Sequence, residues 1–280
     1  MTTIELEYRP LEDRQVDAPG VRRSCAALLT LSRPEDLNPL DAAMIAALDH
    51  ALDEIETRRT TTGDVRAILV TGAGRAFSAG GDLKGYRELQ RDRSAFHHFV
   101  AELHRVFGRL RSGPLPAIAL VNGVAVAGGL ELILNCDFAL AARSARIGDG
   151  HLNFGQMGGG GVLTLLWRAV GRARATELML SGRLLDAEEA AAWGLVSRVV
   201  DDDALLAEGL ALVAGIATKS PLAVANAKQV MHQLWAGGGS VDEDLGVELE
   251  ADVEYCLTSY DAPEGLAAFA EKRTPRFEGR

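Results

Sequence analysis

Glu131 is the first side chain of this sequence whose type and surroundings suggest chemistry. It follows the glycines of NGVAVAGGLEL and lies inside an otherwise apolar stretch. Such a stretch predicts burial, and a buried carboxylate has a raised pKa and needs a partner or a chemical task. A structural ion pair with an arginine is the alternative interpretation of Glu131.

His151 is the second candidate, between the turn IGDG and a run of four glycines, residues 158–161. An imidazole titrates near neutral pH and can give or take a proton, although a lone histidine also serves as a hydrogen-bonded structural residue. His97, His98 and His104 lie on an amphipathic segment without an acidic ligand at suitable spacing. No metal site is predicted from them.

The glycine-rich segments do not match the nucleotide-binding motifs. TGAGRAF has Phe77 where a dinucleotide fingerprint has its third glycine. GGGGVLT lacks the lysine and following hydroxyl residue of a phosphate loop. Tight turns and close helix packing are the structural alternative for these glycines.

Two of these segments resemble each other, AILVTGAGRAFSAGGDL and AIALVNGVAVAGGLEL. Each runs from an apolar strand through a glycine turn and small residues to AGG and a helix. Two such units would place two helix N-termini side by side, with free backbone N–H groups behind a glycine-lined approach. That arrangement suits an anion or a developing oxyanion.

The elements around these segments alternate between strand and helix, which indicates an α/β fold. Strands are predicted over residues 5–10, 24–31, 65–72 and 116–123, and helices over 41–58 and 94–111. From about residue 201 the pattern is helical, with a glycine-rich break at GGGS. We therefore expect a core with the site over residues 1–200 and a helical region over 201–280.

Composition narrows the class of protein. The chain has 280 residues and a net charge of −10, without a basic stripe, so we do not expect nucleic acid as a partner. The longest apolar tract, residues 115–142, contains Glu131 and Asp137, which favours a buried strand and helix over a membrane span. The start of the chain has no apolar leader, and Cys25, Cys136 and Cys256 suit reduced thiols, so a cytoplasmic location is expected.

Several motifs in order resemble the crotonase (enoyl-CoA hydratase/isomerase) superfamily. They are LSRPEDLNPLD, FSAGGDL, NGVAVAGGLEL, CDFALAARSARIG, VGRARATELMLSGRLLDAEEAAAWGLVSRVV and EGLAAFAEKRTPRF, and together they cover nearly the whole chain. The resemblance implies a spiral of repeated ββα units followed by helices that assemble homotrimers, often paired into hexamers. It also implies an acyl-CoA thioester substrate, with coenzyme A entering as part of that substrate and no separate cofactor.

The resemblance assigns roles to individual residues. The backbone N–H groups of Ala79 and Gly128 correspond to the oxyanion hole that holds the thioester oxygen. Glu131 matches the first of two glutamates that hold a water in family hydratases. The position of the second glutamate is occupied here by His151, which is the main departure from the family pattern.

Substrate contacts are also implied for the FSAGGDL segment and for the C-terminal tail. Gly80, Gly81 and Asp82 belong to the first, and Lys272 matches a lysine that reaches a coenzyme A phosphate from a neighbouring subunit. Glu35 replaces a basic residue that family members often carry after RP. The loop GQMGGGG lacks a proline common in the family, which predicts a more flexible or roomier wall for a bulky or cyclic acyl group.

Three hypotheses for function follow. The first is an enzyme of the enoyl-CoA hydratase/isomerase type with Glu131 as general base and His151 as acid or water-positioning group. The second keeps the site and changes the reaction to carbon–carbon hydrolysis or decarboxylation of a β-keto, cyclic or carboxylated acyl-CoA, because the second glutamate is missing. The third is a scaffold that binds without catalysis, which the buried carboxylate argues against.

Overall fold

The structure, a computed structural model, describes residues 3–11 and 24–280. Its strands are β1 (Ile4–Pro10), β2 (Cys25–Leu31), β3 (Val65–Gly72), β4 (Ala76–Ser78), β5 (Ala117–Val121), β6 (Val124–Val126), β7 (Phe138–Ala142), β8 (Arg146–Gly148), β9 (Leu185–Asp186) and β10 (Arg198–Val200). Its helices are α1 (Ala42–Thr62), α2 (Leu83–Leu89), α3 (Arg93–Ser112), α4 (Gly128–Leu134), α5 (Val162–Val170), α6 (Arg172–Ser181), α7 (Ala187–Trp193), α8 (Leu205–Ala217), α9 (Pro221–Gly237), α10 (Val241–Thr258) and α11 (Asp261–Glu271). Three short 3-10 turns, η1 (Pro34–Asp36), η2 (His151–Phe154) and η3 (Asp202–Ala204), complete the order. The strands and helices predicted from the sequence are therefore confirmed within a few residues at their ends.

The strands form two sheets with a repeating chain path. The larger sheet has the order β1-β2-β3-β5-β7-β10 and the smaller one β4-β6-β8-β9. In the three successive pairs β3/β4, β5/β6 and β7/β8, the first strand joins the large sheet and the second joins the small sheet. Apart from β1 with β2 and β8 with β9, the paired strands run parallel. This is the repeated strand–strand unit that the family resemblance implies, and the two similar sequence segments contain two of its copies.

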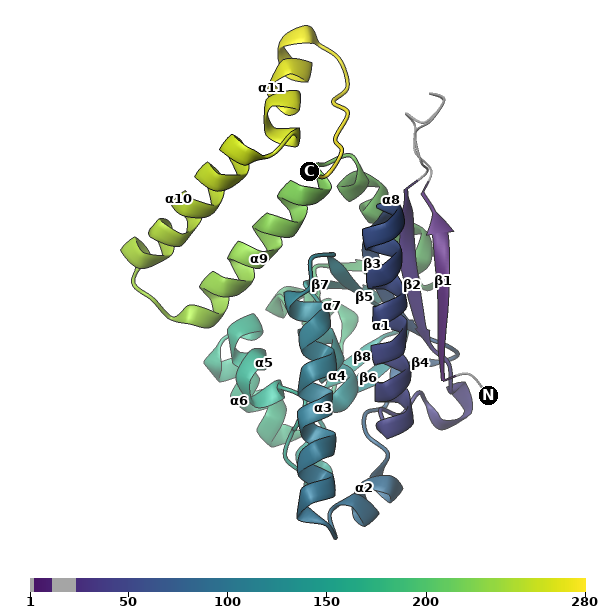
Figure 1. The fold of residues 1–280 in the computed structure, drawn as a ribbon. Helices are drawn as coiled ribbons and strands as arrows, with labels where there is room; N and C mark the ends of the chain where they lie inside the picture. Colours follow the sequence, from purple (N-terminus) through teal and green to yellow (C-terminus); the bar gives the residue numbers. More distant parts are fainter. Residues whose placement is uncertain (1–2, 12–23) are drawn as a thin grey trace.

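The large sheet is buried on both faces. On β2, Leu29 packs into the core cluster that contains α1 and α3, whereas the adjacent Leu28 packs into the cluster that contains α8. Successive side chains of a strand point to opposite faces, so an unbroken apolar run such as CAALLTL is what a sheet covered on both sides requires. Figure 1 shows α1 and α3 running side by side across this sheet.

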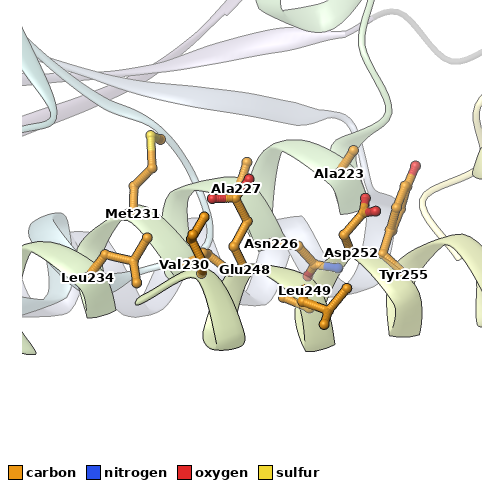
Figure 2. A pocket seen from close by; sticks show the side chains of 12 residues that line it. Ala223, Asn226, Ala227, Val230, Met231, Leu234, Glu248, Leu249, Asp252 and Tyr255 are labelled. Atoms are coloured by element: carbon orange, nitrogen blue, oxygen red, sulfur yellow. The ribbon is translucent and has the colours of Figure 1, made fainter. Parts of the chain in front are cut away.

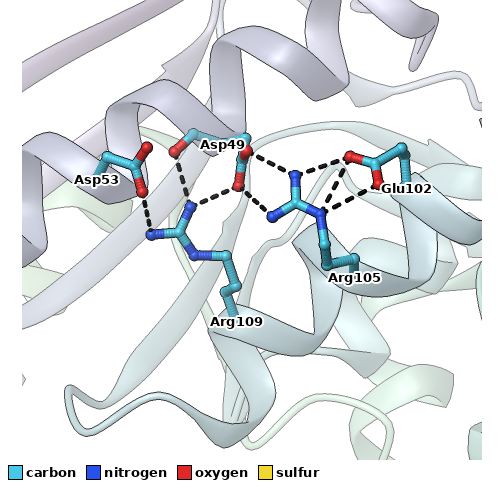
Figure 3. Close-up of polar contacts among 5 residues, drawn as sticks. All are labelled: Asp49, Asp53, Glu102, Arg105 and Arg109. Atoms are coloured by element: carbon cyan, nitrogen blue, oxygen red, sulfur yellow. Dashed lines mark hydrogen bonds and ion pairs between the residues drawn. The ribbon is translucent and has the colours of Figure 1, made fainter.

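Ion pairs join α1 to α3 on their outer side (Figure 3). The Asp49 carboxylate lies 2.6 Å from Nη2 of Arg105 and 2.5 Å from Nη1 of Arg109. Arg109 also pairs with Asp53, and Arg105 with Glu102. Arg105 and Arg109 of α3 are thus each paired with two carboxylates.

The C-terminal helices α9, α10 and α11 form an arm that stands apart from the sheets (Figure 1). The predicted boundary at residue 200 falls before α8, but Leu205 and Val213 of that helix region lie in the core of the large sheet. The arm proper therefore begins at α9. Its helix α10 begins at Val241, where Ser240 and Glu243 form a reciprocal capping box.

The apolar tract 115–142 folds as β5, β6, α4 and β7, as the strand-and-helix interpretation predicted. Within the described ranges no single helix is long and apolar enough to cross a bilayer, and one pair passes that test only jointly, Asp202–Ala217 with Pro221–Gly237, bent by 106°.

Candidate active site

The two similar glycine segments lie against each other at the end of the small sheet. Strands β4 and β6 pair in parallel, with Ala76 opposite Val124. Just beyond them, a Cβ atom at Gly80 would lie 2.9 Å from the Val126 carbonyl oxygen and 3.2 Å from the Gly128 amide nitrogen. Gly80 also has φ +94°, so both its conformation and its surroundings require glycine. The predicted neighbourhood of the two segments is confirmed.

Helix α4 begins at this junction in a strained conformation. Ala127 precedes it with φ 54° and ψ −114°, a region that costs a residue with a Cβ about 1–3 kcal/mol. Gly128 is the first helical residue, and the first N–H groups of a helix have no acceptor within that helix. Its N–H has no acceptor elsewhere in the described chain either, so it is free to bind a ligand oxygen.

The expected oxyanion role of Ala79 is corrected by the structure. The Ala79 N–H donates to the Leu37 carbonyl oxygen at 2.9 Å, so it is already used inside the protein. The Gly80 N–H donates to Oγ of Ser78 at 3.2 Å. The next N–H, that of Gly81, has no acceptor among residues 3–11 and 24–280. Gly81 and Gly128 are therefore the two residues whose free N–H groups this junction offers.

Tyr86 of α2 covers the Gly81 turn and was not anticipated from the sequence. A Cβ at Gly81 would lie 2.8 Å from the Tyr86 hydroxyl oxygen, so the ring lies directly against this glycine. Burial raises the pKa of Tyr86, and the charges of Glu131 and Asp82 raise it further. The ring meets Phe99 of α3 edge to face at 5.4 Å. It forms an apolar wall with a hydroxyl near the free N–H groups.

Two other predicted substrate contacts occupy different places. Asp82 is the N-cap of α2, and its carboxylate accepts a hydrogen bond from the Lys84 N–H at 3.0 Å. Lys272 is the C-cap of α11, a helix of the C-terminal arm, and no described contact joins it to Glu131. Its implied contact with a neighbouring subunit's substrate stays a prediction.

Glu131 lies in the first turn of α4 with only 2% of its side chain exposed. Its Oε1 accepts hydrogen bonds from the N–H groups of Gly160 at 2.7 Å and Val162 at 3.3 Å. Burial raises the pKa of Glu131, although the charge of His151 and the two N–H groups act against that rise. No arginine pairs with it in the described part of the chain, which excludes the structural ion pair considered above.

His151 faces Glu131 and is anchored from behind by Asp149. The His151 Nε2 lies 3.9 Å from Oε2 of Glu131, while Nδ1 lies 2.6 Å from Oδ1 of Asp149. Burial acts to lower the pKa of His151, but the hydrogen bond to Asp149 and the charges of Glu131 and Asp149 outweigh it and leave the pKa raised. Asp149 is 1% exposed and was missed by the sequence analysis. The signal that could have identified Asp149 is an acidic residue two positions before the histidine.

The glycine loop 158–161 packs closely against the side chain of Glu131. A Cβ at Gly160 would lie 2.6 Å from Oε2 of Glu131, and one at Gly158 would lie 2.9 Å from Oε1. The Glu131 carboxylate fills the space that side chains would occupy. These two glycines therefore serve close approach to a carboxylate, and the roomier or more flexible acyl wall expected from GQMGGGG stays a prediction.

These groups form a compact site at the start of α4. One carboxylate oxygen is fixed by backbone N–H groups, and the other faces an imidazole that a second carboxylate orients. The 3.9 Å between Glu131 Oε2 and His151 Nε2 is too long for a hydrogen bond, but a single water oxygen at about 2.8 Å from each would join them. The free N–H groups of Gly81 and Gly128 belong to the same junction, so the chemistry that this arrangement can support is proton transfer beside a developing oxyanion.

Comparisons with known proteins agree with this arrangement. The sequence profile described as enoyl-CoA hydratase/isomerase matches residues 22–280. A probable enoyl-CoA hydratase of Mycobacterium bovis is 36% identical over 253 residues, which are 90% of this chain and 94% of that protein. The 2,3-dehydroadipyl-CoA hydratase of Escherichia coli is 36% identical over 260 residues, 92% of this chain and 97% of that protein.

Solved structures share the whole fold. An enoyl-CoA hydratase from Bacillus anthracis superposes with a TM-score of 0.85 at 32% identity, covering 99% of this chain and 100% of that one. The parallel sheets, the repeated strand pairs and the C-terminal arm are thus those of the crotonase fold. With a profile match over nearly its full length and relatives above one third identity, the chain belongs to the enoyl-CoA hydratase/isomerase family of the crotonase superfamily.

Proposed function

We propose that this chain adds water across the α,β double bond of an enoyl-CoA thioester, with Glu131 as the base and His151 as the acid. Family membership makes it an enzyme of the hydratase/isomerase type that acts on acyl-CoA. The single observation that carries the reaction is the pairing of Glu131 Oε2 with His151 Nε2 at 3.9 Å, which suits two groups that share one water. The relatives from Mycobacterium bovis and Escherichia coli are both named as hydratases, which supports this assignment.

The N–H groups of Gly81 and Gly128 would bind the thioester oxygen. Attack on the β carbon pushes electron density through the double bond to that oxygen, so it becomes an enolate. A preorganised donor placed at such an oxygen is worth about 2.7–4 kcal/mol of transition-state stabilisation. The strained Ala127 fixes the direction of the Gly128 N–H, and Leu37 holds the other turn through Ala79.

Glu131 and His151 then carry the two proton transfers. Oε2 of Glu131 takes a proton from the water as the water oxygen bonds to the β carbon. The Nε2–H of the His151 imidazolium gives its proton to the α carbon, and the enolate electrons form the new C–H bond. A proton passed from Glu131 to Nε2 through the next water restores the starting state. The raised pKa of each group suits transfers near neutral pH.

Replacing Glu131 tests this assignment directly. Glu131→Gln keeps the side-chain shape and an acceptor for the Gly160 N–H but removes the basic oxygen. We expect kcat for crotonyl-CoA hydration to fall about 10²-fold or more, while the thermal midpoint stays close to that of the wild type. Loss of the conjugated absorbance of crotonyl-CoA measures the rate. Unchanged turnover in this variant would exclude Glu131 as the base.

A further inference from the structure

A second hollow lies behind the glycine loop, outside the site described above. It has a volume of about 400 Å³ and is enclosed by α3, α5, α9 and the loop residues Gly160 and Gly161. This volume falls in the range of small-molecule pockets in proteins. The proposed reaction uses none of the side chains that line it.

The lining of this hollow is basic. Four of its side chains carry or can carry a positive charge, and they come from three helices: His104, Arg111, Arg168 and His232. His104 and Arg111 are seven residues apart on α3, so they share one face of that helix. No aspartate or glutamate is present among the described residues that line the hollow. The local electrostatic potential is therefore positive, although the whole chain carries a charge of −10.

No carboxylate of the described residues balances the charge of Arg111. Its guanidinium donates to Oδ1 of the buried Asn135 and meets no carboxylate in residues 3–11 or 24–280. Two turns or less away on the same helix, Arg105 and Arg109 are each paired with carboxylates (Figure 3). Of these three arginines of α3, the one that lines the hollow is therefore the one without a carboxylate partner among the described residues.

The cationic side chains near Arg111 also differ in whether a carboxylate neutralises them. Lys228 of α9 is buried and fully engaged, at 2.7 Å from Asp137 and from two carbonyl oxygens. Among the residues that the structure describes, Arg168 donates only to the Thr164 carbonyl oxygen, and it stacks on the Trp167 ring. Burial lowers the pKa of Arg111, and burial together with the charges of Arg111 and Lys228 lowers that of His232. Partly buried cations without a counter-charge are costly, and a bound anion removes that cost.

We propose that this hollow is a binding site for a small molecule that carries a phosphate or carboxylate group, held by Arg111 and Arg168. The guanidinium forks present paired N–H donors that match either oxyanion. The volume exceeds that of a single phosphate, so the group would be one end of a small organic anion. The side chains of His104, Thr164 and His232 supply further donors around it.

The site shares its inner wall with the catalytic loop. Nδ2 of Asn135 donates to the carbonyl oxygens of Glu131 at 2.8 Å and Gly160 at 3.2 Å, and its Oδ1 accepts from Arg111. Gly160 in turn holds the Glu131 carboxylate through its N–H. An anion that orders Arg111 would therefore also brace the peptide that fixes Glu131.

Anion binding to the unmodified protein tests the proposal without any turnover, so its outcome does not depend on the proposed reaction. Inorganic phosphate and succinate are titrated calorimetrically at constant ionic strength set with sodium chloride, and the thermal midpoint is followed in parallel. We expect saturable binding of at least one of them and a midpoint raised by several degrees. Preference for phosphate or for succinate distinguishes the two ligand chemistries.

Three variants decide where the anion binds. Arg111→Met and Arg168→Gln should each weaken binding about tenfold or more, because each removes a charged donor. Arg105→Gln is the matched control on α3, since its guanidinium is already paired, and it should bind as the wild type does. Arg168→Gln changes a side chain at the rim, so it remains informative if Arg111→Met fails to fold. Absence of saturable binding, or equal binding by wild type and both pocket variants, would overturn the proposal.

Discussion

At the scale of single residues, Asp149 determines how His151 is presented. Its buried carboxylate accepts the Nδ1–H of the imidazole at 2.6 Å, which leaves the Nε2–H directed to Glu131. The same contact favours the charged imidazolium and offsets the effect of burial on the pKa of His151. In the proposed reaction, a histidine held in this way takes the place of the second glutamate of family hydratases as a proton donor.

Asp149→Asn should shift the pH profile of hydration. The amide oxygen can still accept the Nδ1–H, but the negative charge is lost, so the pKa of His151 falls. The acid form of His151 is the active one, and it is present below this pKa and lost as pH rises through it. We therefore expect the alkaline limb of kcat/KM to move to lower pH in the variant, with the acidic limb little changed. An alkaline limb at the same pH in both proteins would show that Asp149 does not tune His151.

Part of this site could be predicted from the sequence and part could not, for physical reasons. Glu131 could be predicted because a charge inside an apolar run is costly, and His151 because its position matches a family acid. The free N–H of Gly81 could not, since the use of the Ala79 N–H by Leu37 depends on a contact between segments about 40 residues apart. Hydrogen-bond direction across such a distance leaves no pattern in composition or spacing.

At the scale of elements, the glycine loop 158–161 sets the position of Glu131. Its backbone, not its side chains, holds the carboxylate, and two of its glycines leave room for that approach. The apolar strands and helices around it followed from their periodicity. The structural role of the glycines could not be predicted, because a loop that packs closely against a side chain and a flexible loop can have the same glycine-rich composition.

Substitutions at two neighbouring glycines distinguish a loop that packs closely against Glu131 from a loose loop. Gly160→Ala would place a Cβ 2.6 Å from Oε2 of Glu131, whereas Gly159→Ala would place one 3.7 Å from Val100, an ordinary contact. Displacing a catalytic group by about 1 Å can cost about 10²-fold in rate. We expect kcat for crotonyl-CoA to fall tenfold or more in Gly160→Ala, on the scale of that estimate, and to stay near the wild-type value in Gly159→Ala. Equal activity of the two variants would contradict the packing role of Gly160.

At the scale of the whole molecule, the C-terminal arm exposes apolar side chains at regular spacing. Leu245, Leu249, Val253 and Leu257 recur every four residues on α10, and Leu257 is 80% exposed. Leu245 and Leu249 of this stripe line a groove of about 810 Å³ between α9 and α10 (Figure 2). Apolar patches of this kind mark interaction surfaces. We propose that the arm buries them between copies of the chain, as homotrimers or homohexamers.

Sedimentation equilibrium measures this assembly. The wild type should have the mass of three or six chains of 29.8 kDa. Leu257→Asp should lower that mass, because it places a charge on the apolar stripe outside the groove. Glu254→Gln, an exposed change on the same helix, should leave it unchanged. A monomeric wild type, or an assembly that Leu257→Asp does not affect, would contradict the proposed interface.

The most direct test of the central claim is crotonyl-CoA hydration by the wild type beside His151→Ala. The Glu131–His151 pair predicts rapid loss of the conjugated absorbance for the wild type and a decrease of about 10²-fold or more in the variant, with its thermal midpoint retained. That result would establish His151 as a working replacement for the second glutamate. Hydration by His151→Ala at the wild-type rate, or no hydration by the wild type, would contradict the account.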